Sequence, residues 1–257
     1  MVITNLNKVN ASSLETTLLG SDSSYGDLIA EIGRLFINKP YKAETLENPG
    51  KEKLIVNVSC FDCTTFVETV LALARCASAG IISRDALRKN LKSIRYRQGK
   101  IDGYSSRLHY FTDWLRDDEN KNILTDVSRN LGGEPQRKKI NFMTAHRESY
   151  AALKNKAQLA KMLVVEKNIS RKISYIIEKD RFSEQKAKIQ NGDVIAFATN
   201  QEGLDVTHVG FAIWQGRSLH LLHASSKEGG VVVSKKTLTS YLKSNKKFTG
   251  IIVARPK

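Results

Sequence analysis

Apolar residues recur at helical spacing through the first two thirds of the chain. The segment YGDLIAEIGRLFINK, residues 25–39, predicts an amphipathic helix that ends before Pro40. The segment CTTFVETVLALARCASAG, residues 63–80, is apolar on almost every side, which predicts a buried helix with Asp62 as its N-cap. Further helices are expected at residues 83–94, 109–117 and 149–166.

The pattern changes after Lys167, where six short apolar or alternating runs follow one another between turn residues. Such runs are typical of the strands of an antiparallel meander, and two helical segments, 183–190 and 236–242, interrupt them. We therefore expect an α+β fold, with helices first and a mainly antiparallel sheet last. The six expected strands are ISYIIE, DVIAFAT, HVGFAIW, SLHLLHA, GVVVS and GIIVAR.

Length and composition are consistent with a folded globular protein. The chain has 257 residues, of which 41% are hydrophobic and 26% charged, so it can bury a sizeable core. We expect a single domain over residues 1–257, with a helical part at 25–166, an insertion at about 95–166 and a sheet part at 171–257. No apolar run is long enough for a transmembrane segment, and the polar opening at 1–17 lacks the apolar stretch of an export signal.

The net charge of +15 predicts a surface that attracts polyanions. The stretch 136–172 contains ten basic and two acidic residues, a net charge of +8. It carries no stacking motif, recognition-helix signature or finger spacing, so the sequence does not favour nucleic acid as the partner. A solvated basic face and docking on anionic polymers of a cell envelope both stay open.

Three cysteines, Cys60, Cys63 and Cys76, lie close together in the sequence. Cys60 and Cys63 form a C-x-x-C pair, but no second pair or suitably spaced histidine completes a zinc site, and no thioredoxin-like βαβ pattern surrounds it. We therefore expect no metal, and we expect Cys60 and Cys76 to be packing residues. Cys63 is different, because the first turn of a helix favours a thiolate and makes it a candidate nucleophile.

The general base for such a nucleophile must be one of five histidines. His208 begins a predicted strand, and His223 lies in the next strand. A hairpin turn centred on Gln215–Gly216 would pair these two residues across the strands, within contact distance. His220 would then face the opposite side of the sheet. The sequence thus predicts a nucleophile, a base and an orienting group in Cys63, His208 and His223.

The motifs FDCTTFVETVLAL, NGDVIAF, THVGFAIW and LHLLHAS, in this order, resemble the NlpC superfamily of papain-like cell-wall hydrolases. DCTTFVE and YSSRLHYFTDW, together with the long insertion, are similar to its N-acetylmuramoyl-L-alanine amidase-like branch. The resemblance implies a papain-like core in which Cys63 is the nucleophile, His208 the base and His223 the residue that orients it. It also implies a peptidoglycan or muropeptide substrate, cleavage through a thioester between N-acetylmuramic acid and L-alanine, and no cofactor.

Substrate contacts are expected mainly from the insertion. Arg107 can form two hydrogen bonds to a peptide carboxylate, and Tyr104 and Tyr110 are candidates for contact with sugar or peptide. Asp62 is a candidate for binding a free amine. The backbone N–H of Cys63 is expected to stabilise the oxyanion, with a second donor from Asp62 or Ser59. The alternative for Tyr110 is packing on the apolar face of a short helix.

Three other functions stay open at this stage. The same Cys/His/His site would serve an endopeptidase that cuts a γ-D-glutamyl bond of the stem peptide. A protein that binds the cell wall without catalysis would need only the basic face, and a redox protein would use Cys60 with Cys63. The family resemblance predicts a periplasmic or envelope location, with a cytoplasmic one also open.

Overall fold

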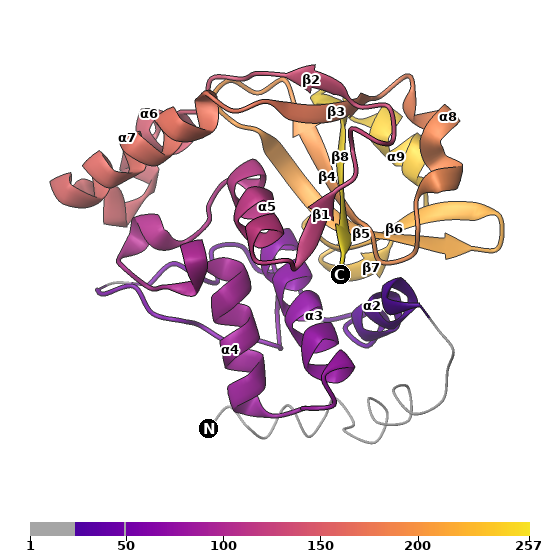
Figure 1. The fold of residues 1–257 in the computed structure, drawn as a ribbon, viewed down its shortest axis with the longest axis horizontal. Helices are drawn as coiled ribbons and strands as arrows, with labels where there is room; N and C mark the ends of the chain where they lie inside the picture. Colours follow the sequence, from indigo (N-terminus) through magenta and orange to yellow (C-terminus); the bar gives the residue numbers. More distant parts are fainter. Residues whose placement is uncertain (1–23, 49) are drawn as a thin grey trace.

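The computed structural model describes residues 24–48 and 50–257, in which an antiparallel sheet has helices on both faces (Figure 1). The opening segment 1–17, where we looked for an export signal, lies outside these residues. Within the described residues, no helix combines the length and apolarity needed to cross a membrane. The helices are α2 (Tyr25–Arg34), α3 (Cys63–Ser78), α4 (Arg84–Arg95), α5 (Phe111–Asn120), α6 (Phe142–Ala145), α7 (Lys156–Ser170), α8 (Phe182–Gln185) and α9 (Leu238–Ser244).

The sheet has the strand order β2-β3-β8-β4-β5-β6-β7, and β1 pairs with β8 outside this path. All six expected strands are present, but they do not form a simple meander, because β8 lies between β3 and β4. Two strands in the insertion, β1 and β2, escaped prediction because each has only three residues. The strands are β1 (Leu124–Asp126), β2 (Glu134–Gln136), β3 (Ser174–Glu178), β4 (Val194–Thr199), β5 (Val206–Gln215), β6 (Ser218–Ser225), β7 (Gly230–Val233) and β8 (Phe248–Pro256).

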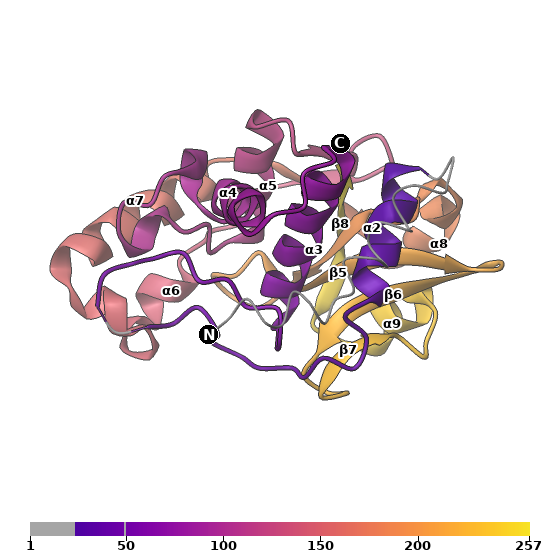
Figure 2. The same cartoon turned by 90° about the horizontal axis from the view of Figure 1, so that it is seen from below.

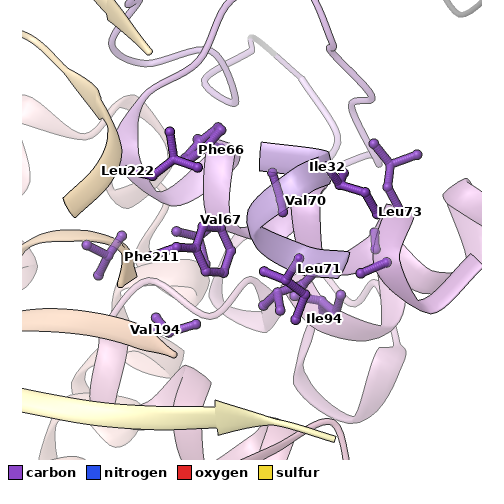
Figure 3. Close-up of a cluster of buried hydrophobic side chains, with 14 of the residues drawn as sticks. Ile32, Phe66, Val67, Val70, Leu71, Leu73, Ile94, Val194, Phe211 and Leu222 are labelled. Carbon is purple, nitrogen blue, oxygen red and sulfur yellow. The ribbon is translucent and has the colours of Figure 1, made fainter. Parts of the chain in front are cut away.

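The central strand β4 is buried along its whole length, because both faces of the sheet are covered. Val194 and Ala196 face the cluster formed with α2, α3 and α4, and Ile195 and Phe197 face a second cluster with α8 and α9. Figure 3 shows the first cluster, in which apolar side chains of α3 pack against Phe211 and Leu222 of the sheet. The apolar pattern of residues 63–80 correctly predicted that α3 is buried.

The insertion forms a third cluster of buried side chains, which includes Tyr110, Met143 and Met162. The single helix expected at 149–166 is wrong in its first third. Residues 147–149 and 151–154 form two 3₁₀ turns, and α7 begins only at Lys156, after Asn155. The Asn155 side chain accepts hydrogen bonds from the N–H groups of Ala157 and Gln158, which caps the helix there.

Candidate active site

Cys63 is the first residue of α3, and the residues around it hold the helix start in place. The Asp62 carboxylate accepts a hydrogen bond from Thr65 N at 2.7 Å, and the Thr65 hydroxyl accepts one from Asp62 N at 3.0 Å. This reciprocal pair is a capping box and confirms Asp62 as the N-cap. The sulfur of Cys63 therefore lies at the end of the helix where unpaired N–H groups accumulate.

His208 on β5 and His223 on β6 lie in contact, with His208 Nε2 2.7 Å from His223 Nδ1. The register that we expected is wrong by two positions. The ladder pairs Gln215 with Ser218, so the turn is Gly216–Arg217 and His208 is not directly opposite His223. A shift of two positions keeps each side chain on its face of the sheet, and a diagonal neighbour is still within reach.

A glycine makes room for this pair. A Cβ atom at Gly210, on β5, would lie 2.8 Å from the Cβ of His223, closer than real side chains approach. His223 is only 1% exposed, and the ring of Tyr241 on α9 packs edge-on against it at a centroid distance of 5.4 Å. The second imidazole is thus enclosed by the sheet and by α9.

Cys63 and His208 line the same small pocket, of about 90 Å³, which we call the catalytic pocket. Its other walls are mostly apolar. His109, which precedes α5, adds a second imidazole. The apolar lining comes from Val67, Leu108, Phe111, Trp114, Val206 and Val209.

The reactive groups of this pocket are neutral. Burial and the Asp62 carboxylate raise the pKa of the Cys63 thiol to about 11, although the backbone N–H of Val209 partly offsets them. Burial and the neighbouring His223 lower the pKa of His208 to about 3, and burial lowers that of His223 to about 4. At neutral pH the resting site therefore holds a thiol and two neutral imidazoles, so the proton has to move during the reaction.

Comparisons with known proteins identify the family of this chain. A family model described as N-acetylmuramoyl-L-alanine amidase-like matches residues 31–251. The chain belongs to this family. A crystal structure of an N-acetylmuramoyl-L-alanine amidase from Bacteroides uniformis is 40% identical, has a TM-score of 0.87 and covers 91% of this chain and 100% of its own. Membership of the amidase-like family supports an amidase-like hydrolase that acts on peptidoglycan.

Two further structures are similar to this amidase-like chain. A crystal structure of a putative xylanase from Bacteroides fragilis is 45% identical, with a TM-score of 0.83, and covers 88% of this chain and 99% of its own. A Legionella pneumophila protein, 24% identical with a TM-score of 0.71, shares the fold alone. No curated protein matches the sequence.

The three residues of the insertion that we expected to contact substrate, Tyr104, Arg107 and Tyr110, do not line the catalytic pocket. Tyr104 and Arg107 line a separate cavity of about 900 Å³ beside the catalytic pocket. Tyr110 is 1% exposed, and its hydroxyl donates to Glu166 at 2.6 Å and accepts from Met143 N at 2.9 Å. Tyr110 therefore packs inside the insertion, and we propose no substrate contact for it.

The expected second oxyanion donors are already occupied. Asp62 N donates to the Thr65 hydroxyl, and Ser59 N donates to the Asn57 side chain at 2.8 Å. The backbone N–H of Val209, which faces the sulfur of Cys63, is a further donor that the sequence did not predict. The Val209 N–H reaches Cys63 only because α3 packs against β5. No local sequence motif could have indicated this contact.

Cys60, Cys76 and His220 do not line the catalytic pocket. Cys60 and Cys63 are both free, and the amide of Asn57 is 3.0 Å from the Cys60 sulfur. Cys76 is buried near Asn90. His220 Nδ1 lies 2.8 Å from the backbone oxygen of Ser234, so its ring is held at the β7 side of the hairpin.

Sequence reasoning missed a buried ion pair that braces α3. Glu68 and Arg95 are each 2% exposed in their side chains, and their charged atoms lie 2.6 Å apart. Arg95 also donates to the backbone oxygen of Ile55 at 2.6 Å. The pair thereby ties α3 to α4 and to the segment that precedes Cys63. The partners are 27 positions apart in the sequence, so no local pattern could indicate this contact.

Proposed function

We propose that this protein is a cysteine amidase that cleaves the amide between N-acetylmuramic acid and L-alanine. The observation that carries the proposal is the meeting of Cys63, at the start of α3, with His208 in one pocket, where His223 holds the second ring nitrogen of His208. Family membership supplies the substrate class, and the residues supply the chemistry. By the resemblance stated above, the proposal extends to a papain-like catalytic core within one catalytic domain.

In the first step, the sulfur of Cys63 attacks the lactyl carbonyl while its proton passes to His208. With Nε2–H of His208 donated to His223 Nδ1, the free Nδ1 of His208 is the atom that accepts this proton. The backbone N–H groups of Cys63 and Val209 stabilise the oxyanion. The C–N bond then breaks, the amine of L-alanine takes the proton from His208, and a thioester remains on Cys63.

In the second step, water attacks the thioester and gives its proton to His208. The C–S bond breaks, the lactyl carboxylic acid leaves, and Cys63 recovers its proton. Starting from a neutral thiol and neutral imidazole, both half-reactions need His208 alternately as base and acid. His223 serves as a positioning residue, because it keeps the His208 ring in one orientation and one tautomer.

The test is mass spectrometry of defined muropeptides incubated with the protein and with Cys63→Ala. We expect release of stem peptides that carry a free L-alanine amine, and none with Cys63→Ala. A Cys60→Ser variant serves as the control and should retain activity, because Cys60 lies outside the catalytic pocket. Cleavage inside the stem would show an endopeptidase instead, and full activity of Cys63→Ala would overturn the cysteine mechanism.

We also propose a periplasmic or cell-envelope location, because the proposed substrate is found there. The basic stretch 136–172 runs over α6, two 3₁₀ turns and α7 at one end of the molecule (Figure 1). We propose that this face adds electrostatic attraction to anionic envelope polymers. Retention of the protein on isolated cell walls should then fall as the salt concentration rises.

A further inference from the structure

The cavity of about 900 Å³ lies between the segment that joins α2 to α3 and one side of the insertion. Figure 2 shows this segment running along the molecule towards α7 before it returns to the start of α3. We call this space the charged cavity. Its lining includes Glu47, Glu52, Lys51, Lys53, Tyr104 and Arg107.

One pair of aromatic rings separates the charged cavity from the catalytic pocket. Tyr104 lines the cavity, His109 lines the pocket, and their ring centroids are 4.4 Å apart. A catalytic pocket of about 90 Å³ accommodates only the few atoms around a scissile amide. The rest of a muropeptide must extend beyond it, and the charged cavity is next to it.

The inner end of the charged cavity carries an excess of negative charge. Arg107 is 6% exposed and lies between two carboxylates, with Glu47 at 2.8 Å and Glu52 at 3.4 Å. Glu52 is also nearly buried, and it accepts a hydrogen bond from Tyr96 at 2.7 Å. Glu47 is 38% exposed. Because one guanidinium faces two carboxylates, Glu47 is available to a second cation that enters the cavity.

A buried donor in the same network lacks a hydrogen-bond partner. Arg107 Nε is buried without an acceptor at hydrogen-bonding geometry, since Glu52 at 3.4 Å is positioned only for charge attraction. A buried unsatisfied donor costs free energy and is uncommon in a folded protein. A ligand cation that draws Glu47 away would let the guanidinium settle on Glu52 and satisfy this group.

The outer lining has the opposite charge. Lys51 and Lys53 are exposed and line the same cavity as Glu47 and Glu52. A ligand with an ammonium group and a carboxylate side by side would match this order of charges. A neutral sugar would gain little here, because Tyr104 is only 6% exposed and its ring already contacts Arg107 and His109.

We propose that the charged cavity binds the zwitterionic end of a diamino acid residue of the stem peptide. The ammonium group pairs with Glu47, and the carboxylate faces Lys51 and Lys53. The protein would thereby distinguish stem peptides that carry this residue from shorter ones. That the stem peptide is joined to N-acetylmuramic acid rests on the proposed function. Binding of the zwitterionic residue does not require cleavage.

The test is calorimetric binding to Cys63→Ala, which works whether or not the protein is an amidase. The probe is MurNAc-L-Ala-γ-D-Glu-meso-diaminopimelate, compared with MurNAc-L-Ala-D-isoglutamine and with the tripeptide acetylated on its free amine. We expect the probe to bind about tenfold more tightly than either comparison ligand, the usual effect of one charge-assisted hydrogen bond. Equal affinities for all three ligands would overturn the proposal.

Variants locate the effect. Glu47→Gln should remove most of the tenfold difference, and Glu184→Gln on α8, an exposed carboxylate outside the cavity lining, should leave it unchanged. Lys51→Gln with Lys53→Gln tests the carboxylate contact without touching the buried network and should weaken probe binding. A Glu47→Gln protein that keeps the full preference would overturn the proposal, as would Glu47-dependent binding of a peptide-free GlcNAc-MurNAc disaccharide.

The two proposals fail in different ways. Tight binding of the probe with no hydrolysis by the intact protein would refute the amidase function and leave the charged cavity as a peptide site. Hydrolysis with no preference for the zwitterionic probe would support the amidase function and refute the assignment of the cavity.

Discussion

The catalytic pocket and the charged cavity meet at the contact between Tyr104 and His109, yet they differ in size, charge and burial. The pocket has a volume of about 90 Å³, is mainly apolar and holds a thiol and imidazoles that are neutral at neutral pH. The cavity has a volume of about 900 Å³ and is lined by carboxylates, a guanidinium and lysines. The difference separates two tasks. Under the two proposals, proton transfer takes place in the small apolar pocket, and charge recognition takes place in the large cavity, which a long substrate can enter.

The largest effect should come from removing the base of the catalytic pocket. His208→Ala should lower kcat/KM for muropeptide hydrolysis by about 10³-fold, because no other group on β5 can take the thiol proton. His220→Ala is the matched control, since His220 lies one strand away and outside the pocket, and it should keep kcat/KM within about twofold. Similar losses in both variants would show that the two histidines matter only for the fold.

The next effect concerns the buried ion pair of Glu68 and Arg95, which connects α3 to the segment that lines the charged cavity. Arg95→Ala leaves Glu68 buried without its partner and should lower the free energy of unfolding by about 3–5 kcal/mol, measured by urea denaturation. Lys92→Ala, an exposed position on the same helix, should change it by less than about 0.5 kcal/mol. If Arg95→Ala proves as stable as Lys92→Ala, the pair does not connect α3 to the wall of the charged cavity.

The neutral histidines should make the protein sensitive to acid. Burial and the charge of Arg107 lower the pKa of His109 to about 3, so between about pH 6.5 and pH 4 the unfolded chain binds a proton that the folded one does not. Stability therefore falls with decreasing pH in this range. His109→Gln should reduce this slope by about 1.4 kcal/mol per pH unit, and the exposed His146→Gln should not. Urea denaturation at several pH values measures both, and equal slopes in the two variants would contradict the buried neutral state of His109.

The smallest effect tests the charge next to the nucleophile. Asp62→Asn removes the carboxylate that raises the pKa of Cys63 but keeps a residue that can cap α3. The rate of alkylation of Cys63 by iodoacetamide at pH 8 should rise about threefold. The same assay on the Cys63→Ala background reports the other cysteines and is subtracted. An unchanged or slower rate would mean that Asp62 acts on Cys63 only through the helix cap.

The meeting of Cys63, His208 and His223 at one site was predictable because the evidence for it is local. Asp62, Cys63 and the apolar run behind them specify a capped, buried helix, and the alternation in β5 and β6 puts His208 and His223 on one face even though the expected turn was one residue early. The charged cavity was not predictable. Arg107 meets Glu47 across 60 residues, and only the course of the segment before α3 brings them together.

The start of α7 shows a different limit of the sequence pattern. The apolar spacing of residues 149–166 fits one helix, but the Asn155 side chain offers its oxygen to two backbone N–H groups and moves the boundary. Such local competition for hydrogen bonds does not appear in hydrophobic periodicity. The sequence leaves the position of Tyr110 open for a related reason. The Tyr110 hydroxyl reaches Glu166 only because α7 packs against the rest of the insertion.

The hairpin between β5 and β6 has a consequence for how this protein can vary among organisms. Displacing its two-residue turn by one position along the chain changes each cross-strand partner by two, which returns every side chain to the same side of the sheet. Moving the turn one position earlier would place His208 and His223 directly opposite each other, whereas moving it one position later would offset them by four positions. The turn can therefore move towards the N-terminus without separating the imidazoles, but a move in the other direction would break the contact between His208 and His223.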